Sequence, residues 1–259
     1  MTTFVSFNIN GLRARPHQLI AVRDMLGADI IGLQETKVHN EAFPLADVQS
    51  LGYHVEFFGQ KAHYGVAILS KNAPIFVQKG FPFGDPDAQR RLIHARFDIG
   101  GREIDVINGY FPQGENRSHE TKFPMKRAFY ADLNTYIDDL KGQGRELIVM
   151  GDMNISPHDN DVGIGDANAK RWLRNGTCSF LPEEREWYGD LMSRNLHDTY
   201  RKFNPDNADQ FSWFDYRSKG FEDTPKRGLR IDHILCTDGL ITKTLDRKSG
   251  SAGMPRPIA

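Results

Sequence analysis

The stretch ELIVMGDMN, residues 146–154, carries the clearest indication of the fold. Residues 147–150 form a short apolar run of the kind that makes a buried strand, and Gly151 and Asp152 end it abruptly. In α/β proteins, ligands bind at the carboxyl ends of the strands. The stretch therefore predicts an inner strand that brings Asp152 and Asn154 to a functional site.

Similar strand patterns occur on both sides of this stretch. Apolar runs at 29–33 and 65–69 predict two further buried strands. Residues 92–97 and 103–110 read as a hairpin turned at Gly100-Gly101. Alternating or apolar patterns predict additional strands at 4–7, 211–214 and 229–235.

Helix patterns lie between some of these strands. Apolar residues at 129, 133, 136, 137 and 140 share one helical face, and Gly142 and Gly144 can end that helix. Further helices are expected after Pro16 and from Pro182, where acidic residues suit the first turn. Strands, hairpins and helices in this order predict an α/β fold, with two packed mixed β-sheets flanked by helices.

Composition and length favour one globular domain. Of the 259 residues, 39% are hydrophobic and 26% are charged, which argues against disorder. We expect a single domain over residues 1–245, followed by a tail at 246–259, where the sequence DRKSGSAGMPRPIA has no strand or helix pattern.

Targeting signals and cysteine spacing point to the cytoplasm. The N-terminus lacks the pattern of a signal peptide, and no apolar run is long enough to span a membrane. The two cysteines, Cys178 and Cys236, are far apart and show no metal-ligand spacing. We therefore expect reduced thiols in a cytoplasmic protein without membrane contact.

The net charge is close to zero, but the basic residues are clustered along the sequence. A net charge of −1 and a pI near 6.8 weakly oppose nucleic-acid binding through the overall field. Basic residues nevertheless cluster at 117–127, 170–174 and 217–230. One such cluster is usually solvated surface, but three beside the polar strand ends favour phosphate contacts.

Oxygen-bearing side chains follow several predicted strands. Asn8 comes after 4–7 and Glu35 after 29–33, in the same way as Asp152 and Asn154 follow 146–150. Carboxylate and amide oxygens suit a hard cation, and no His/Cys cluster suggests zinc, so magnesium or manganese is expected. Taken singly, each residue has a structural alternative: Asn8 and Asn154 as turn formers, Asp152 as a cap.

The ordered series of motifs along the chain resembles the exonuclease III family of endonuclease/exonuclease/phosphatase-fold enzymes, and is closest to its bacterial members. The motifs are FNINGLRARP (7–16), IIGLQETK (30–37), HYGVAILSK (63–71), INGYFPQGE (107–115), MGDMNISP (150–157), KRWLR (170–174), FLPEEREW (180–187), FSWFDYRSKGF (211–221) and GLRID (228–232). A single motif of this kind is weak evidence, whereas the ordered series is specific.

The resemblance implies a four-layer α/β sandwich and a metal-dependent DNA phosphodiesterase of base-excision repair. Such an enzyme acts as a 3′→5′ exodeoxyribonuclease and as an apurinic/apyrimidinic endonuclease. Its implied partner is duplex DNA with abasic sites or recessed 3′ ends, its cofactor Mg²⁺ or Mn²⁺, and its state a monomer. Which activity dominates, including removal of a 3′ phosphate, stays open.

The resemblance also implies roles for residues. Asn8 and Glu35 would form the metal site together with Asp152 and Asn154. Asp152 would orient and deprotonate the attacking water. Asn154 would donate a hydrogen bond to the negative charge that develops during the reaction. Tyr110 would contact the phosphate or assist the leaving group, although a packed aromatic at a strand end is the structural alternative.

Further residues are implied to bind DNA. Phe211 and Trp213 resemble the aromatics that line the pocket for a flipped abasic sugar, with stacked core aromatics as the alternative. Phosphate contacts, which position the duplex without reading its sequence, are expected from Arg91, Lys122, Arg171 and Arg217.

The sequence departs from the family at its C-terminal end. Family members carry a strand with S-D-H, whose His contacts the phosphate and is oriented by the residue matching Asp232; this sequence contains no S-D-H. His233 is no substitute, because adjacent strand residues point to opposite faces. A truncated or frameshifted reading frame is the favoured explanation, and the alternative function is a family member that binds DNA with little or no catalysis.

Overall fold

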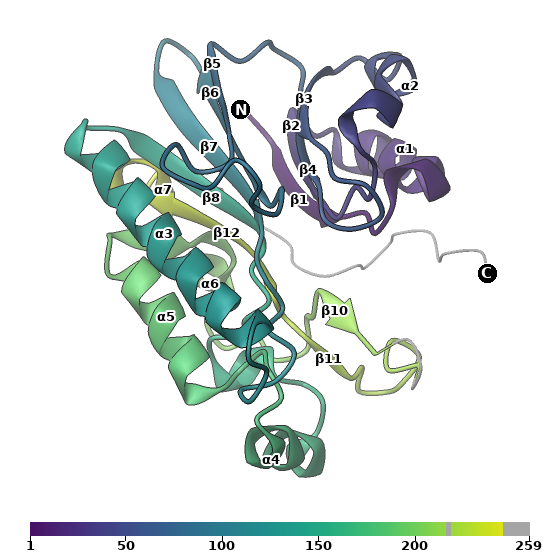
Figure 1. The fold of residues 1–259 in the computed structure, drawn as a ribbon, viewed down its shortest axis with the longest axis vertical. Helices are drawn as coiled ribbons and strands as arrows, with labels where there is room; N and C mark the ends of the chain where they lie inside the picture. The colour runs from purple at the N-terminus through teal and green to yellow at the C-terminus, as the bar shows by residue number, and fades with distance from the viewer. Residues whose placement is uncertain (216–218, 246–259) are drawn as a thin grey trace. The chain divides into compact units, whose positions relative to one another are not determined.

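The computed structural model describes residues 1–215 and 219–245 (Figure 1). The chain has an α/β fold in which mixed sheets of four and six strands are flanked by helices, which confirms the expected fold class. Its described residues form two compact units: 1–110 with 145–152, and 111–144 with 153–215 and 219–245. The assignment of residues 1–245 to one catalytic domain stays a prediction, and the expected tail lies outside the described residues.

The first sheet of the first unit has the strand order β1-β2-β4-β3. Its strands are β1 (Phe4–Asn8), β2 (Ile30–Gln34), β3 (His54–Phe58) and β4 (Val66–Ser70). β1 and β2 are parallel, whereas β4 is antiparallel to both β2 and β3. Helix α1 (Pro16–Leu26) places Leu19 and Val22 in one hydrophobic cluster with Ile31 and Leu33, and therefore covers this sheet; α2 (Leu45–Gln49) adds Val48 to the cluster.

The same unit contributes a second run of strands, in the order β5-β6-β7-β8. They are β5 (Phe76–Lys79), β6 (Leu92–Asp98), β7 (Glu103–Tyr110) and β8 (Glu146–Asp152). β5, β6 and β7 are antiparallel neighbours, and β7 and β8 are parallel. The hairpin β6–β7 turns at Gly100-Gly101, as expected, with φ values of 63° and 79° at these glycines.

A buried amide joins the two layers of strands. Asn108 on β7 donates through Nδ2 to the carbonyl oxygens of Leu33 and Ala67, at 2.9 Å each, and its Oδ1 accepts from Gln34 Nε2 at 2.6 Å. Gly32 makes room for it, since a Cβ at that position would lie 2.7 Å from Asn108 Oδ1. Every partner is buried, so the link fixes how β2 and β4 pack on β7.

The second unit is built mainly of helices. Its long helix α3 (Lys122–Gly142) packs beside α5 (Pro182–Met192), with the rings of Phe123 and Trp187 5.2 Å apart. β12 (Asp232–Thr237) is antiparallel to β9 (Leu196–Asp198). Its other elements include α4 (Asp166–Asn175), α6 (Thr199–Phe203), the ribbon of β10 (Trp213–Phe214) with β11 (Gly228–Leu229), α7 (Asp238–Ile241) and the 3-10 helix η3 (Asp159–Asp161). None of the described helices has the length and apolar character needed to cross a membrane.

Two expected strands are shorter in the structure. The strand expected at 211–214 is reduced to β10, and the one expected at 229–235 is interrupted between β11 and β12. The interruption has a physical cause: the Arg230 amide donates to the Asp161 carbonyl, and the Ile231 carbonyl accepts from Met153. The backbone of these two residues is therefore bonded to loops rather than to a continuous ladder.

Candidate active site

The candidate site lies in the first unit, at the carboxyl ends of four strands. β1 ends at Asn8 and β8 at Asp152, and Tyr110, the last residue of β7, is the parallel partner of Asp152. Asn8 donates through Nδ2 to Asp152 Oδ2 at 2.9 Å, which ties β1 to β8. The structure thus brings together residues that are 144 positions apart in the chain.

The strand that carries Asp152 depends on a glycine. Gly151 has a φ of 149°, and a Cβ there would lie 1.9 Å from the carbonyl oxygen of Gly109 on the neighbouring strand. Only glycine permits this approach of two backbones. The G-D dipeptide of the motif is therefore a steric requirement for placing Asp152 beside β7.

Glu35 follows β2 in a strained conformation. Its φ is 57°, in the left-handed region that few residues other than glycine adopt. Surrounding backbone bonds hold it there: Gly11 donates to the Glu35 carbonyl at 2.8 Å, and Thr36 donates to the Gly65 carbonyl at 3.1 Å. Lys37 Nζ lies 3.1 Å from Glu35 Oε1. Strain that is held in this way is typical of functional sites.

Tyr110 is a phenol that resists ionisation. Burial raises the pKa of Tyr110 well above its usual value, and the charges of Asp152 and Glu35 together with a hydrogen bond to Glu35 raise it further, whereas Arg91 opposes them. The neutral hydroxyl therefore persists at high pH. It can donate a hydrogen bond to an oxygen that gains negative charge.

Arg91 supports Tyr110 from the interior. It is only 8% exposed; its Nη1 donates to the Tyr110 carbonyl at 3.0 Å and its Nε to Gln89 Oε1 at 2.6 Å. The guanidinium lies over the rings of Tyr64, at 4.0 Å, and Tyr110, at 4.9 Å. A phosphate contact by Arg91 stays a prediction, and the observed contacts show a side chain packed against Tyr110.

The donor set of the first unit fits a hard cation. Glu35 and Asp152 supply carboxylates, and Asn8 supplies an amide oxygen that also accepts from the Asn10 amide at 3.0 Å. Both carboxylates raise the pKa of Tyr110, so the site concentrates negative charge that a divalent ion would offset. Within residues 1–215 and 219–245 no group of three or more His, Cys, Asp or Glu side chains could hold a metal.

Asn154 belongs to the second unit, two residues beyond Asp152. It is 5% exposed and has a φ of 54°. Its Nδ2 donates to the Phe111 carbonyl at 2.9 Å, and its own carbonyl accepts from Lys126 Nζ at 2.8 Å. Its side chain and its backbone are therefore each held by a hydrogen bond within this unit.

Asp232 and His233 begin β12 and differ in environment. The half-buried Asp232 donates its backbone amide to Ser212 Oγ at 3.0 Å. His233 is 2% exposed; its Nε2 lies 2.9 Å from the Ile155 carbonyl and its Nδ1 3.5 Å from Asp198 Oδ2. The burial of His233 agrees with the expectation of a packed strand residue, and the expectation that it does not replace the family's His stays a prediction.

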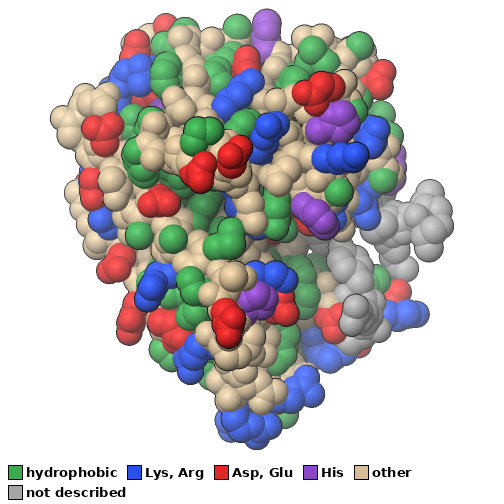
Figure 2. Space-filling model, in the orientation of Figure 1, with side chains coloured by type: hydrophobic (Ala, Val, Ile, Leu, Met, Phe, Trp, Pro, Cys, Tyr) green, Lys and Arg blue, Asp and Glu red, His purple; other side chains and the backbone are tan. Residues whose placement is uncertain are grey.

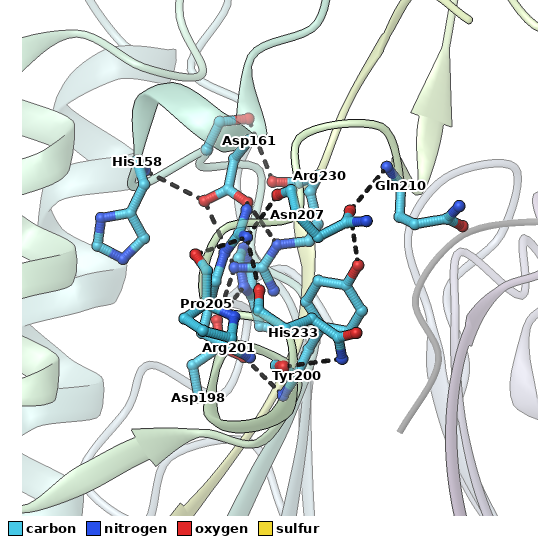
Figure 3. A network of polar contacts seen from close by, with 12 residues as sticks. His158, Asp161, Asp198, Tyr200, Arg201, Pro205, Asn207, Gln210, Arg230 and His233 are labelled. Atoms are coloured by element: carbon cyan, nitrogen blue, oxygen red, sulfur yellow. Dashed lines mark hydrogen bonds and ion pairs between the residues drawn. The ribbon is translucent and has the colours of Figure 1, made fainter. Parts of the chain in front are cut away.

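A buried ionic network surrounds His233 (Figure 3). Arg230 Nε and Nη2 donate to Asp161 and Asp198, at 2.6 Å each, and Arg201 also donates to Asp161. Burial alone would raise the pKa of Asp198, but hydrogen bonds to His233 and the charge of Arg230 outweigh it and hold the pKa far below its usual value. The network fixes the chain just before Asp232.

The predicted DNA-binding residues lie in different settings. Lys122 on α3 and Arg171 on α4 are exposed, and Figure 2 shows Lys and Arg side chains gathered over α4, where Lys170 and Arg174 are exposed too. Lys122 pairs with Glu115. Arg217 lies outside the described residues.

The two predicted pocket aromatics are packed. Phe211 is 3% exposed and fills the space beside Gly163, where a Cβ would lie 1.9 Å from its ring. Trp213 is half-buried, with its ring edge-on to Trp172 at 6.4 Å. Phe211 thus matches the core alternative, whereas Trp213 keeps an accessible part.

The sequence analysis did not identify the roles of two residues that contact site residues, Tyr64 and Lys126. Tyr64 stacks on Arg91, and its position within the motif HYGVAILSK was the available signal. Lys126 was grouped with basic residues expected to contact phosphate, yet it is fully buried. Its spacing of three and four residues from Phe129 and Tyr130, on the apolar face of α3, was the signal against exposure.

Several known proteins are similar to this chain in sequence or fold. A model of the Endonuclease/Exonuclease/phosphatase family matches residues 5–252. Exodeoxyribonuclease III of Haemophilus influenzae is 57% identical over 243 residues, covering 94% of this chain and 90% of that protein.

Two solved structures are also similar. An AP endonuclease from Archaeoglobus fulgidus has a TM-score of 0.84 at 35% identity, covering 95% of this chain and 90% of that one. A 3′ phosphatase from Neisseria, bound to a product DNA hairpin, has a TM-score of 0.82 at 33% identity, covering 96% of this chain and 95% of that one.

Proposed function

Because this chain belongs to the endonuclease/exonuclease/phosphatase family, we propose that it cuts the backbone of duplex DNA at abasic sites and recessed 3′ ends. The resemblance to the exonuclease III branch is confirmed, and that branch consists of metal-dependent phosphodiester hydrolases of DNA repair. The observation that carries the proposal is the contact of Asn8 with Asp152, at strand ends that also carry Tyr110.

Asp152 is the proposed base. Its Oδ2 accepts from Asn8, which fixes the plane of the carboxylate, and the carboxylate is proposed to take a proton from the attacking water. Asn8 therefore orients the base in addition to offering its own oxygen to a cation. Asn154, two residues further along the chain, is proposed to donate a hydrogen bond to the negative charge that develops on the phosphate.

Tyr110 is the proposed donor to the phosphate or the leaving oxygen. Its raised pKa keeps the hydroxyl protonated, and the stacked Arg91 holds the ring in place. A neutral donor beside two carboxylates can bind an anionic oxygen without adding negative charge of its own.

Glu35, with Asn8, Asp152 and Asn154, is proposed to hold Mg²⁺ or Mn²⁺. When bound there, the ion supplies positive charge beside the scissile phosphate. Oxygen donors are the ligands that these two cations prefer, which supports them over zinc.

Several finer features belong to the same proposal. Lys122, Arg171 and Arg217 are proposed to contact the DNA backbone, and Trp213 to face the abasic sugar. The working form is proposed to be a monomer in the cytoplasm. Two buried thiols support that compartment, with burial raising the pKa of Cys178 to about 12.

A second candidate is a protein that binds abasic duplex and cuts it poorly. The observation in its favour is the sequence itself, which keeps Asp232 but contains no S-D-H. Loss of one donor to developing charge costs about 10²–10³ in rate.

Binding and cleavage measured on one labelled abasic duplex separate the two candidates. Affinity and turnover are compared with those of a family member that contains S-D-H. The proposed nuclease requires metal-dependent turnover above the uncatalysed rate. Tight binding with no turnover at any Mg²⁺ or Mn²⁺ concentration supports the second candidate instead.

A further inference from the structure

A fully buried ion pair lies in the second unit, outside the residues proposed for catalysis. Lys126 on α3 and Glu184 on α5 are both 0% exposed, and Lys126 Nζ lies 2.6 Å from Glu184 Oε1. The ammonium has two further partners, the Asn154 carbonyl at 2.8 Å and the Gln113 carbonyl at 3.3 Å. Its three N–H donors therefore have three acceptors.

The other oxygen of Glu184 is equally engaged. Its Oε2 accepts from the backbone amides of Ser179, at 2.7 Å, and Leu181, at 2.9 Å. Glu184 thereby caps α5 and fixes the chain that precedes it, while Ser156 donates its amide to the Ser179 carbonyl at 2.6 Å. The pair consequently joins α3 and α5 to the segment that carries Asn154.

Such a pair contributes little to stability. Removing two charges from water costs several kcal/mol, and apolar residues of similar size often replace a buried pair without loss. Stability alone therefore does not account for a lysine at position 126. Its contact with the Asn154 carbonyl offers a more specific reason.

The backbone of Asn154 needs outside support. Its φ of 54° lies in the left-handed region, which asparagine adopts more readily than most non-glycine residues but which neighbouring contacts must still hold in a single conformation. Rotating residue 154 to an ordinary negative φ would redirect both its carbonyl and its side chain. Lys126 holds the carbonyl, and the Phe111 carbonyl holds the side-chain amide.

We propose that Lys126 is a positioning residue for Asn154. Its ammonium, neutralised by Glu184, fixes the Asn154 carbonyl and so keeps the residue in the left-handed conformation that directs its side chain. The catalytic consequence rests on the function proposed above for Asn154, whereas the conformational consequence does not.

The test uses the full chain with Lys126→Met combined with Glu184→Gln. The double change avoids leaving a carboxylate buried without its partner, and the Gln oxygen can still accept from Ser179 and Leu181. Lys141→Met is the matched control, because Lys141 lies on the same helix and also donates to a backbone carbonyl, that of Arg194.

The first measurement is the conformation of residue 154 by NMR. A positive φ brings the amide and α protons of one residue close together and gives a strong cross-peak between them. We expect that signature at residue 154 in the unmodified chain and in Lys141→Met, and its loss in the double variant. A residue 154 that keeps its positive φ in the double variant overturns the proposal, whatever the turnover.

The second measurement is turnover on abasic duplex, with and without Asn154→Ala. We expect the double variant to lower kcat by about tenfold to a hundredfold with KM unchanged, and to cause no further loss when Asn154 is already Ala. Equal losses in both backgrounds would show a general structural role and contradict the proposal. Should Asn154→Ala itself leave turnover unchanged, the function assigned to Asn154 fails, while the conformational result still decides the role of Lys126.

Discussion

Three residues at or near the strand ends have a backbone conformation or position that the surrounding structure enforces. Glu35 and Asn154 each occupy the left-handed region, and Asp152 depends on the glycine that precedes it. In each case the backbone is held by hydrogen bonds or by a steric limit, so the fold fixes the direction of the side chain. Under the proposed function, polar groups fixed in this way would stabilise the charge that develops in phosphoryl transfer.

Glu35→Gln tests the metal site at this scale. The amide keeps the shape of the side chain but removes one anionic ligand, so the metal concentration for half-maximal activity should rise by about tenfold or more. DNA affinity measured without metal should change little. Glu41→Gln, an exposed carboxylate paired with His39, is the control. An unchanged metal requirement in Glu35→Gln would remove Glu35 from the site.

Tyr110 makes a prediction about alkaline pH. Its pKa is raised in the folded protein, so the folded state holds this proton more tightly than the unfolded chain, whose Tyr titrates near 10.0. The resulting stability is fully present below that pH and declines as the pH rises above it. The free energy of unfolding should therefore fall more steeply above pH 10 in the unmodified chain than in Tyr110→Phe. Identical slopes would show that Tyr110 is not shielded in this way.

At the scale of elements, short polar segments decide where the site residues lie. β12 starts only after Arg230 and Ile231 have made their bonds to loops, and the buried network of Arg230, Asp161 and Asp198 sets that start. The segment between β11 and β12 therefore takes its structure from ion pairs and not from an apolar sequence pattern.

Arg230→Met tests this network. Removing the guanidinium leaves Asp161 and Asp198 buried without their main partner, which should cost about 3–5 kcal/mol of unfolding free energy. Because both carboxylates have a lowered pKa, the stability that they provide is present above their unfolded pKa of 3.8 and is lost as the pH falls below it. Denaturant unfolding across this pH range should show that decline in the unmodified chain and much less of it in Arg230→Met. Arg23→Met, at an exposed pair with Asp24, should change neither quantity.

Most elements could be predicted from the sequence because their apolar residues are periodic. The strands that became β2, β4 and β8 contain nearly continuous apolar runs, and α3 carries its apolar residues on one face. The strands β6 and β7 are more mixed, and the Gly100-Gly101 turn between them was the stronger signal. Helix α4 was not predicted, because it is short and most of its residues are polar, although Ala169 and Trp172 pack against a hydrophobic cluster. The interruption at Arg230 was also unpredictable, because its partners Asp161 and Asp198 are distant in sequence.

Contacts between residues distant in sequence also limited what could be predicted of the candidate site. The positions of Asn8, Glu35 and Asp152 after strands were readable, and so was their convergence at strand ends. The burial of Lys126 was not inferred despite its place on the apolar face of α3, because a lysine is buried only with a partner, and Glu184 lies 58 residues away.

At the scale of the whole molecule, each unit contains its own support for the residues that it carries. The first unit holds Asn8, Glu35, Tyr110 and Asp152 through two layers of strands joined at Asn108. The second holds Asn154 and Asp232 through buried ion pairs among helices and loops. The family match extends over residues 5–252 and so includes both units.

The central claim is metal-dependent hydrolysis with Asp152 as the base, and the most direct test is cleavage of an abasic duplex by the unmodified chain and by Asp152→Asn. The amide preserves the contact with Asn8 but cannot take a proton, so turnover should fall by about 10²–10⁴-fold while folding and DNA affinity persist. Chelation of the metal should abolish cleavage by the unmodified chain. Undiminished cleavage by Asp152→Asn, or cleavage that survives the chelator, would contradict the account.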